Sequence, residues 1–391
     1  MRPLENTTVI SLEQAVAAPF AARQLGDLGA RVIKIERPGV GDFARRYDGT
    51  VNGLSSHFVW CNRSKESLTL NLKAEAGKEI LEKLLAQADV FIQNLAPGAT
   101  ERLGFDSERL LADYPELIVC NISGYGSSGP YRDKKAYDAL IQAETGLFSI
   151  TGTEDTPSKA GISVADIAGG MYAYSGILAA LLARSQNGEG AVLEVSLFEA
   201  LAEWMGYAYY FTMGGKAPER NGSSHAAIAP YGLFPTGDGQ TVMLGIQNER
   251  EWARFCEDVL SKPEMIRDER FASNSSRVAN RQAMRQEIEA IFTQLTAEEI
   301  MAKLEAAQIA NAQARSMESF LDHPQLKALQ KWTEVDSPNG PIPALLPAVS
   351  HVGMVPNMGA IPTVGEHTKA ILQELDYSNE EIREFELRGV V

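Results

Sequence analysis

The sequence predicts an α/β protein with a mostly parallel sheet in a large domain, joined to a smaller α+β domain. Short β-rich runs alternate with helical patterns through the first 200 residues, which is typical of a parallel sheet covered by helices on both faces. Gly, Pro and Ser then cluster in residues 213–232, which indicates a connection between domains. We predict a large domain of residues 1–212 with 325–391, a small domain of 225–320, and linkers at 213–224 and 321–324.

Local periodicity places the elements of the large domain. In residues 75–88, Ile80, Leu84 and Leu85 recur at helical spacing while charged residues lie between them, so this segment predicts an amphipathic helix. The same reasoning predicts strands at 7–12, 31–36, 67–72, 89–95, 117–126 and 191–197, and further helices at 19–29 and from Asp166 onward.

The small domain is expected to begin with a hairpin. Residues 233–246 read "LFPTGDGQTVMLGI", with a turn at Gly237–Gly239. Thr296 and Glu299 match a capping box at the start of a helix. Helices are predicted at 249–260, 280–295 and 296–307, and two short C-terminal helices follow a Pro-rich stretch at 337–363 and return to the large domain.

Composition excludes several classes of partner. The 391 residues carry a net charge of -15, which repels nucleic acid and anionic membranes. No continuous apolar run reaches the ~18 residues of a membrane span, and the N-terminus lacks a secretion signal. Three cysteines and five scattered histidines form neither a disulfide framework nor a metal motif. We expect a cytoplasmic protein with no metal and no tightly bound cofactor.

Asp166 is the most unusual acid in the chain, because it lies in the apolar stretch "KAGISVADIAGGMYAYSGILAALLAR". One interpretation is an N-cap, whose carboxylate accepts from free N–H groups at a helix start. The other is an anionic nucleophile at the same helix end. Gly169 and Gly170 each cost a helix about 1 kcal/mol, which favours a site where something bulky approaches the backbone.

Three other stretches indicate ligand contacts. Arg37 follows a predicted strand, and parallel sheets bind ligands at this end of their strands. Its guanidinium could bind a phosphate there. A solvent-exposed turn would give the same sequence pattern. "GYGSSG" at 124–129 matches the G-x-G-x-x-G motif of dinucleotide-binding proteins. In those proteins a helix follows the motif directly and a strand ending in an acidic residue comes ~20 residues later. Here Pro130 follows the motif and no such strand is predicted. It is therefore interpreted as a flexible loop near a ligand. "KKAYD" at 134–138 begins a helix, or is an ordinary solvated charge run.

Taken together, these stretches resemble the class III CoA-transferase family, which includes formyl-CoA:oxalate and carnitine CoA-transferases. The resemblance runs through nearly the whole chain and is densest from residue 9 to 200. It rests on six blocks in order, "AAPFAARQLGDLGARVIKIERPGVGDFAR", "NRSKESLTLNLKAEAGKE", "ADVFIQNLAPGATERLG", "ISGYGSSGPY", "KKAYDALIQAETGL" and "ADIAGGMYA".

The resemblance implies a Rossmann-like large domain, an interlocked homodimer, and a nucleophilic aspartate at Asp166. Asp166 would attack an acyl-CoA and carry CoA as an aspartyl thioester before passing it to an acceptor acid. We expect N–H groups near Gly169 and Gly170 to stabilise the oxyanions. The implied CoA contacts are Val16, Ala17, Arg37, Leu70, Asn71, Leu72, Lys73, Asn94, Leu95, Ala96, Arg102, Lys135, Ala136, Tyr137 and Asp138.

The acceptor side departs from the formyl-CoA enzyme. The tetraglycine loop of that enzyme has no counterpart here, and a glutamine of its first loop is replaced by Val16. Val16 makes the acceptor pocket more apolar, which suits an acid with a longer carbon chain better than oxalate. We therefore expect succinyl-CoA as donor and a dicarboxylate such as itaconate, mesaconate or citramalate as acceptor. Five side chains are candidates to bind the distal carboxylate of such an acid: Arg45, His57, Arg63, Arg220 and His225. The alternative is that they are ordinary surface or interface residues.

Three alternatives remain open on the sequence. An α-methylacyl-CoA racemase uses the same aspartate with a histidine, but the matching triplet here is Ala136–Tyr137–Asp138, and racemisation needs a base on each face of the carbon. The second alternative is intramolecular transfer, in which CoA moves between the two carboxyls of one diacid, as in a mesaconyl-CoA C1–C4 transferase. A non-catalytic CoA-binding protein is the third.

Overall fold

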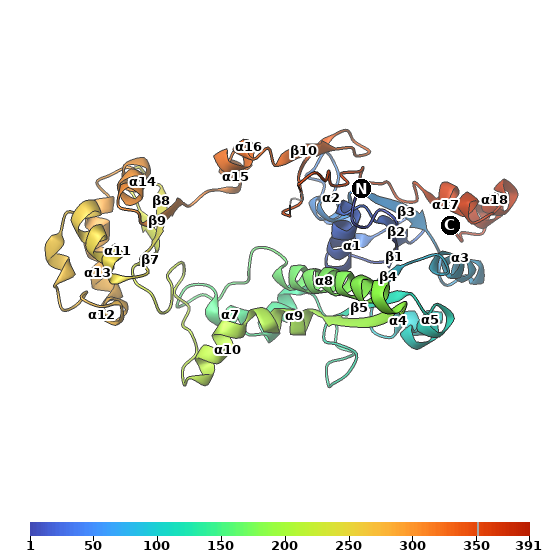
Figure 1. Cartoon of the computed structure of the whole chain (residues 1–391), viewed down its shortest axis with the longest axis horizontal. Coiled ribbons are helices and arrows are strands. Elements are labelled where there is room, and N and C mark those ends of the chain that lie inside the picture. Colours follow the sequence, from blue (N-terminus) through green and yellow to red (C-terminus); the bar gives the residue numbers. More distant parts are fainter. Residues whose placement is uncertain (350–351) are drawn as a thin grey trace. The chain divides into compact units, whose positions relative to one another are not determined.

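The computed structural model describes residues 1–349 and 352–391, which form two units. Unit 1 comprises residues 1–145, 160–206 and 326–391, and unit 2 comprises 146–159 and 207–325 (Figure 1). Residues 146–159 and 207–212 were expected in the large domain, and 213–224 as a linker. The first of these segments belongs to unit 2 because Gly222 N donates to Gly152 O at 2.8 Å, and Arg220 binds the carbonyls of Thr153 and Glu154.

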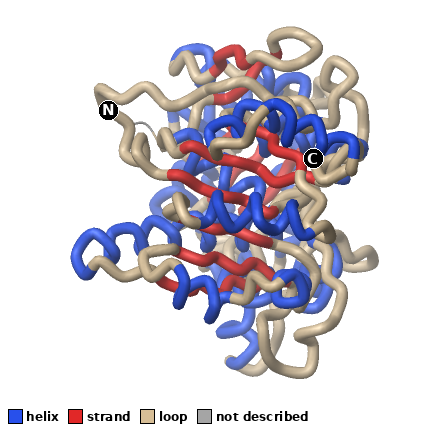
Figure 2. The backbone as a smooth tube through the Cα atoms, turned by 90° about the vertical axis from the view of Figure 1, so that its right-hand side faces the viewer, coloured by secondary structure: helices blue, strands red, loops and turns tan. Residues whose placement is uncertain are grey.

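Unit 1 is built on a parallel sheet, which appears in Figure 2 as a ladder of strands between helices. Its order, β3-β2-β1-β4-β5-β6, reverses between β1 and β4, and in open parallel sheets ligands bind outside the carboxyl ends of the strands at such a reversal. The strands, which confirm those predicted, are β1 (Thr8–Leu12), β2 (Arg31–Glu36), β3 (Lys65–Thr69), β4 (Val90–Gln93), β5 (Ile118–Ser123) and β6 (Ala191–Ser196).

The strands alternate their side chains between two cores, because successive residues of a strand face opposite sides of the sheet. Val9 packs into one core and Ile10 into the other. The first core contains α1 (Ala17–Asp27), α6 (Asp138–Glu144), α8 (Val164–Asn187) and α9 (Leu197–Trp204). The second contains α3 (Glu75–Leu85), α5 (Ser107–Asp113), α17 (Thr368–Glu374) and α18 (Asn379–Leu387), with α4 (Ala99–Leu103) at its margin.

A smaller cluster completes unit 1. Phe58 of α2 (Ser56–Asn62) packs against Val335 and Ile342 of an antiparallel pair, β10 (Trp332–Val335) and β11 (Ile342–Leu345). A 3-10 helix at Phe43–Arg46 precedes α2.

Small residues let α8 lie very close to α1 and α9. A Cβ on Gly170 would lie 2.7 Å from the carbonyl oxygen of Ala17, and one on Gly169 would lie 2.5 Å from Cδ2 of Leu197. Both glycines lie inside the helix, so their N–H groups belong to its hydrogen-bond ladder. The expectation that they stabilise oxyanions is therefore corrected: what approaches their backbone is protein, not substrate.

The same helix is apolar as well as long. Among the described residues, α8 has the length and mean hydropathy of a membrane span, although 39% of its most apolar stretch is buried inside the protein. A core helix of a soluble protein has the same properties, and the contacts of α8 with α1 and α9 are core contacts.

Unit 2 has its own core around a three-stranded antiparallel sheet, ordered β7-β8-β9. The hairpin of β7 (Tyr231–Pro235) and β8 (Thr241–Gly245) is confirmed, as is the capping box of Thr296 and Glu299. The remaining elements are β9 (Ala310–Gln313), α7 (Leu147–Ile150), α10 (Gly206–Met213), α11 (Glu249–Arg254) with a π-helical turn at Phe255–Val259, a 3-10 helix at Pro263–Ile266, α12 (Asn274–Ala279), α13 (Arg281–Phe292), α14 (Ala297–Ala306), α15 (Met317–Leu321) and α16 (Pro324–Ala328). The first residue of α10 and the last three residues of α16 belong to unit 1.

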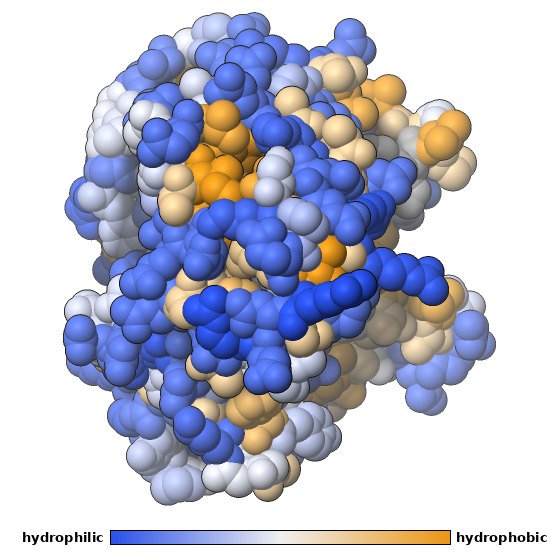
Figure 3. Space-filling view, turned by 90° about the vertical axis from the view of Figure 1, so that its left-hand side faces the viewer, coloured by the Kyte–Doolittle hydropathy of each residue, from blue (hydrophilic) through white to orange (hydrophobic). Residues whose placement is uncertain are grey.

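The surface in Figure 3 is mostly hydrophilic, with apolar patches between polar side chains. Acidic residues outnumber basic ones by 51 to 36 over the whole sequence, so such a surface keeps the protein soluble through charge.

We predict that Gly170→Ala lowers the free energy of unfolding by about 1–3 kcal/mol, because the added methyl overpacks the crossing of α8 and α1. Gly176→Ala is the matched control in the same helix: its nearest neighbour would be Leu193 Cδ1 at 3.6 Å. It should stabilise by up to about 1 kcal/mol through helix propensity. Thermal or urea unfolding of both variants measures the difference, and equal effects would contradict the tight crossing.

Candidate active site

A cavity of about 650 Å³ opens in unit 1 at the carboxyl ends of β1, β4 and β5. Its position matches the reversal in strand order. It is lined by Gln14, Ala15, Val16, Ala17, Phe43, Tyr47, His57, Asn94, Leu95, Ala96, Pro97, Ile122, Ser123, Gly124, Lys134, Lys135, Ala136, Tyr137, Asp138, Ala139, Ser163, Asp166 and Leu197.

Asp166 supplies the carboxylate of this cavity. It is the third residue of α8, whose N-cap is Ser163, so the N-cap interpretation of Asp166 is wrong. Within residues 1–349 and 352–391, no hydrogen bond or ion pair to its carboxylate is present. Burial, and then the negative charge of Asp138, raise the pKa of Asp166 to about 7, because both disfavour the ionised form. A carboxylate of that basicity is a better nucleophile than an ordinary one.

The side chain of Asp138 binds the first turn of this helix, which the N-cap residue Ser163 leaves without a side-chain bond. Its Oδ1 accepts from Ala165 N at 2.8 Å and its Oδ2 accepts from Gln142 Nε2 at 2.6 Å. Asp138 also lines the cavity, so its expected contact with CoA stays a prediction. Asp138 therefore positions Asp166 and also tunes its pKa.

The loop between β1 and α1 forms a second wall. Asn94, at the end of β4, holds Gln14 through two bonds of 2.8 Å, one to its N–H and one to its carbonyl. Ala15 takes a left-handed conformation with φ of 62°, which is uncommon for a residue with a side chain. The loop ends at α1, and in the described part of the chain the N–H groups of Ala17 and Ala18 have no side-chain acceptor.

Aromatic side chains form the third wall. Tyr47 and His57 meet edge to face, with ring centroids 5.4 Å apart. Burial, and then Asp42 and Asp166, raise the pKa of Tyr47 to about 12, so Tyr47 lies within electrostatic reach of the Asp166 carboxylate. The Nδ1 atom of His57 is buried and lies 4.0 Å from Asp48 Oδ2. The His57 side chain as a whole is 41% exposed. The exposed part of the ring therefore lies on its other atoms.

Exposed cations follow the strands that end at this edge of the sheet. Arg37 follows β2, Lys73 follows β3, Arg102 lies on α4 after β4, and Lys135 lies between β5 and α6. Lys134 differs from these because it is paired with Glu144 and lies over the Tyr131 ring. Positive side chains at one edge suit the phosphates of a nucleotide-like ligand.

Eleven of the predicted site residues line the one cavity: Val16, Ala17, His57, Asn94, Leu95, Ala96, Lys135, Ala136, Tyr137, Asp138 and Asp166. Those of unit 1 that do not line it are Arg37, Leu70, Asn71, Leu72, Lys73, Arg102, Arg45, Arg63, Gly169 and Gly170.

Two of the cations expected to hold a distal carboxylate are already occupied. Arg45 forms a bidentate pair with Glu36, at 2.7 and 2.8 Å. Arg63 forms a bidentate pair with Asp27, also at 2.7 and 2.8 Å. Because both guanidiniums are committed to buried acids, the substrate role expected for Arg45 and Arg63 is corrected.

Arg220 and His225 belong to unit 2. Arg220 is held by two backbone carbonyls, and His225 Nδ1 accepts from Ala227 N at 3.1 Å. Neither lines the cavity of unit 1.

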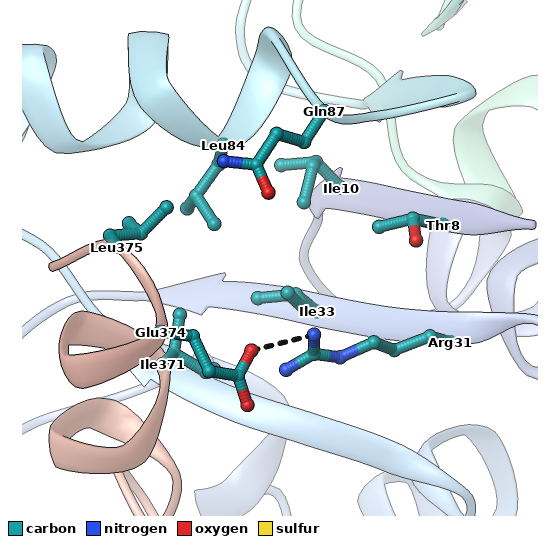
Figure 4. A pocket seen from close by; sticks show the side chains of 9 residues that line it. All are labelled: Thr8, Ile10, Arg31, Ile33, Leu84, Gln87, Ile371, Glu374 and Leu375. Carbon is teal, nitrogen blue, oxygen red and sulfur yellow. Dashed lines mark ion pairs between the residues drawn. The ribbon is translucent and has the colours of Figure 1, made fainter.

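A second cavity of about 60 Å³ lies at the opposite end of the sheet, near the start of β1 and β2. Figure 4 shows Leu84, Ile10 and Leu375 lining it, with Arg31 paired to Glu374. Its volume is too small for an acyl-CoA, so it is not a substrate site. No cluster of three or more His, Cys, Asp or Glu suited to a metal is present among the described residues.

Comparison with known proteins decides the family. A model of CoA-transferase family III matches residues 4–368. The chain belongs to CoA-transferase family III. Its relatives in this family are enzymes that act on acyl-CoA substrates, and this chain is a family III CoA-transferase.

Two curated relatives and one solved structure show how similar the chain is to other members. The succinyl-CoA:glutarate CoA-transferase of Mus musculus is 35% identical over 401 residues, which cover 100% of this chain and 91% of that protein. The succinyl-CoA–D-citramalate CoA-transferase of Chloroflexus aurantiacus is 30% identical over 387 residues, covering 96% and 94%. The crystal structure of a CAIB/BAIF family protein from Brucella suis superposes with a TM-score of 0.86 and 32% identity, covering 96% of this chain and 100% of that chain.

Sequence reasoning missed the aromatic wall. Phe43 lies within the stretch that contains Arg37, but only the arginine was given a role there, and Tyr47 lies just beyond it in a segment without regular periodicity. An aromatic pair after a glycine loop was the available signal. Gln14 and Ala15 were missed because only the fold brings the β1–α1 loop next to α8.

We predict that, with the ionised Asp166 carboxylate as the attacking group, kcat/KM falls about tenfold per pH unit below pH 7, since the pKa of Asp166 is about 7. Above pH 7 the profile should be flat until another group titrates. Asp138→Asn keeps the amide-binding oxygen but removes a negative charge, so the midpoint should move to lower pH. A pH–rate profile of both proteins tests this, and a midpoint that moves upward in the variant would contradict it.

Proposed function

We propose that this protein moves CoA from succinyl-CoA to a small dicarboxylic acid through a covalent aspartyl-CoA intermediate on Asp166. The observation that carries the proposal is the Asp166 carboxylate, unpaired among the described residues and with a pKa of about 7 in a 650 Å³ cavity. Relatives named for glutarate and D-citramalate support a dicarboxylate acceptor. The expected acceptors itaconate, mesaconate and citramalate belong to the same class of acid.

In the first half-reaction, Asp166 attacks the thioester carbonyl of the donor. The tetrahedral intermediate collapses by breaking the C–S bond, which gives a mixed anhydride and the CoA thiolate. The thiolate then attacks the aspartyl carbonyl of the anhydride, and the donor acid leaves as its carboxylate. Asp166 now carries CoA as a thioester, so the energy of the donor bond is retained.

The second half-reaction reverses these steps with a new acid. The acceptor carboxylate attacks the aspartyl thioester, which releases the CoA thiolate and forms a second mixed anhydride. The thiolate attacks the acceptor's carbonyl, giving the new acyl-CoA and restoring the Asp166 carboxylate. No proton or electron is gained or lost over the cycle.

Two features of the cavity support this chemistry. The unoccupied N–H groups of Ala17 and Ala18 at the start of α1 are donors for the oxyanions, where one donor is typically worth about 3 kcal/mol. They replace the glycine N–H groups that the sequence analysis expected. The partly buried surroundings of Asp166 limit the water that would hydrolyse an anhydride.

The bound CoA would extend from Asp166 toward the exposed cations. Arg37, Lys73, Arg102 and Lys135 follow successive strands at one edge of the sheet and are available to its phosphates. The aromatic wall of Phe43, Tyr47 and His57 is then left for the acyl group, with His57 as a donor to a distal carboxylate.

We predict that incubation with succinyl-CoA leaves a CoA adduct on Asp166. Intact-mass analysis should show it, and hydroxylamine should remove it, since hydroxylamine cleaves thioesters. Asp166→Ala should form no adduct and show no transfer. Asp133→Ala, which removes an exposed acid of the nearby loop, is the control and should keep both. A parent enzyme that transfers CoA without any adduct would overturn the proposal.

The acceptor is identified by offering one donor with a panel of acids, including glutarate, itaconate, mesaconate, citramalate and oxalate. Formation of an isomeric acyl-CoA without any added acid would instead favour intramolecular transfer. Deuterium uptake from solvent at the α-carbon of a branched acyl-CoA would favour racemase chemistry. Binding of CoA with no reaction at all would favour a non-catalytic protein.

We also propose that the protein is a homodimer. Large apolar side chains on α10 remain exposed, with Tyr210 at 68% and Met213 at 76%, and such surfaces are typical of protein interfaces. Sedimentation equilibrium should give twice the 42.5 kDa of one chain. A single-chain mass at micromolar concentration would contradict this.

A further inference from the structure

Six charged side chains lie together beneath the cavity, and we call them the ion cluster. They are Glu13, Lys34, Glu36, Asp42, Arg45 and Lys65, three acids and three bases that come from the residue after β1, from β2, from the start of β3 and from the segment after β2. Lys34 Nζ lies 3.1 Å from Glu13 Oε1 and 2.9 Å from Asp42 Oδ2. The side chains of Lys34, Glu13 and Lys65 are fully buried.

Ion pairing within the cluster opposes the effect of burial on the pKa values of Glu36 and Lys65. Burial opposes ionisation of Glu36, but Arg45 and Lys34 outweigh it and lower its pKa to about 2. Burial lowers the pKa of Lys65 to about 8, and Glu13 opposes that effect. Buried ion pairs contribute less stability than well-packed apolar side chains of similar volume. The cluster therefore calls for an explanation other than stability.

Asp42 connects the cluster to two walls of the cavity. Its Oδ1 accepts from Ala15 N at 3.2 Å and from Ala44 N at 2.9 Å, while Oδ2 binds Lys34. Ala15 lies in the β1–α1 loop, and Ala44 lies between Phe43 and Tyr47 on the aromatic wall. One buried carboxylate thus ties the two walls to each other and to the centre of the sheet.

The strain at Ala15 makes this tie important. A left-handed conformation is unfavourable for a residue with a Cβ, so the loop needs bonds that hold Ala15 in place. The Asp42 bond to Ala15 N and the Asn94 bonds to Gln14 supply them. Without Asp42, the loop is free to relax and change the distance to Phe43 and Tyr47.

We propose that Asp42 is a positioning residue that sets the spacing between the Ala15 loop and the Phe43–Tyr47 wall, and thereby the enzyme's discrimination between acids of different length. This rests on the proposed transfer of CoA to small acids. In a fitted pocket, one methylene changes kcat/KM by about 10- to 200-fold. A pocket whose walls are no longer held at one spacing loses most of that difference.

The test measures kcat/KM for two acceptors that differ by one methylene, glutarate and succinate, with a donor of a different acyl group. The ratio of the two values does not depend on how much enzyme is folded. In Asp42→Ala, no side-chain oxygen remains to accept from Ala15 N and Ala44 N, so the ratio should fall to within about threefold of unity. An unchanged ratio would overturn the proposal.

Asp27→Ala is the matched control. Asp27 is also a buried acid, 2% exposed like Asp42, and it binds Arg23 and Arg63, but neither of these two arginines lines the cavity, whereas Ala15, which Asp42 binds, does. Its substitution should reduce stability and leave the acceptor ratio unchanged. If both variants change the ratio equally, the effect is general loosening and the proposal fails.

A second measurement uses the unmodified enzyme and does not depend on the folding of a variant. Hydrogen exchange of peptides spanning residues 14–17 and 43–47 should be slow, since Asp42 binds N–H groups in both. Exchange as fast as in an unstructured loop would overturn the proposal. A parent enzyme that forms no adduct and transfers to no acid would instead refute the proposed function, so the two failures are distinguishable.

Discussion

The close crossing of α8 over α1 is the constraint on which the site depends. Gly170 lies so close to the Ala17 carbonyl that a Cβ would come within 2.7 Å of its oxygen, and Asp166 lies one turn earlier on the same helix. The crossing therefore brings the carboxylate toward the first N–H groups of α1. A residue larger than glycine at position 170 would push the two helices apart and separate the Asp166 carboxylate from these N–H groups.

The buried acids of unit 1 show how local charge sets chemistry. Glu36 accepts hydrogen bonds from Arg45 and Ser67, and its pKa is lowered to about 2. Asp166 has no hydrogen-bond donor or cation bound to its carboxylate among the described residues. Burial and the nearby Asp138 raise its pKa to about 7. Paired carboxylates hold the structure together, whereas Asp166 is more basic because, in the described part of the chain, no cation stabilises its charge.

The sequence could not separate functional cations from structural ones. Arg45 and Arg63 looked as available as Arg37, but they are bound to Glu36 and Asp27 inside unit 1. Their partners are 9 and 36 positions away in the chain, and no local pattern relates such residues. Similarly, Gly169 and Gly170 predicted a close approach to the backbone, but only the packing shows that the neighbour is protein.

The sequence by itself determined the parallel strands, the helix that begins near Asp166 and the family to which the chain belongs, because periodicity and ordered motifs are local properties. Only the tertiary structure decided that the Asp138 side chain binds the first turn of that helix, that Tyr47 and His57 face the same cavity as Asp166, and that Asp42 joins two of its walls. These relations depend on how the strands are ordered in the sheet, which brings together loops that are distant in the chain.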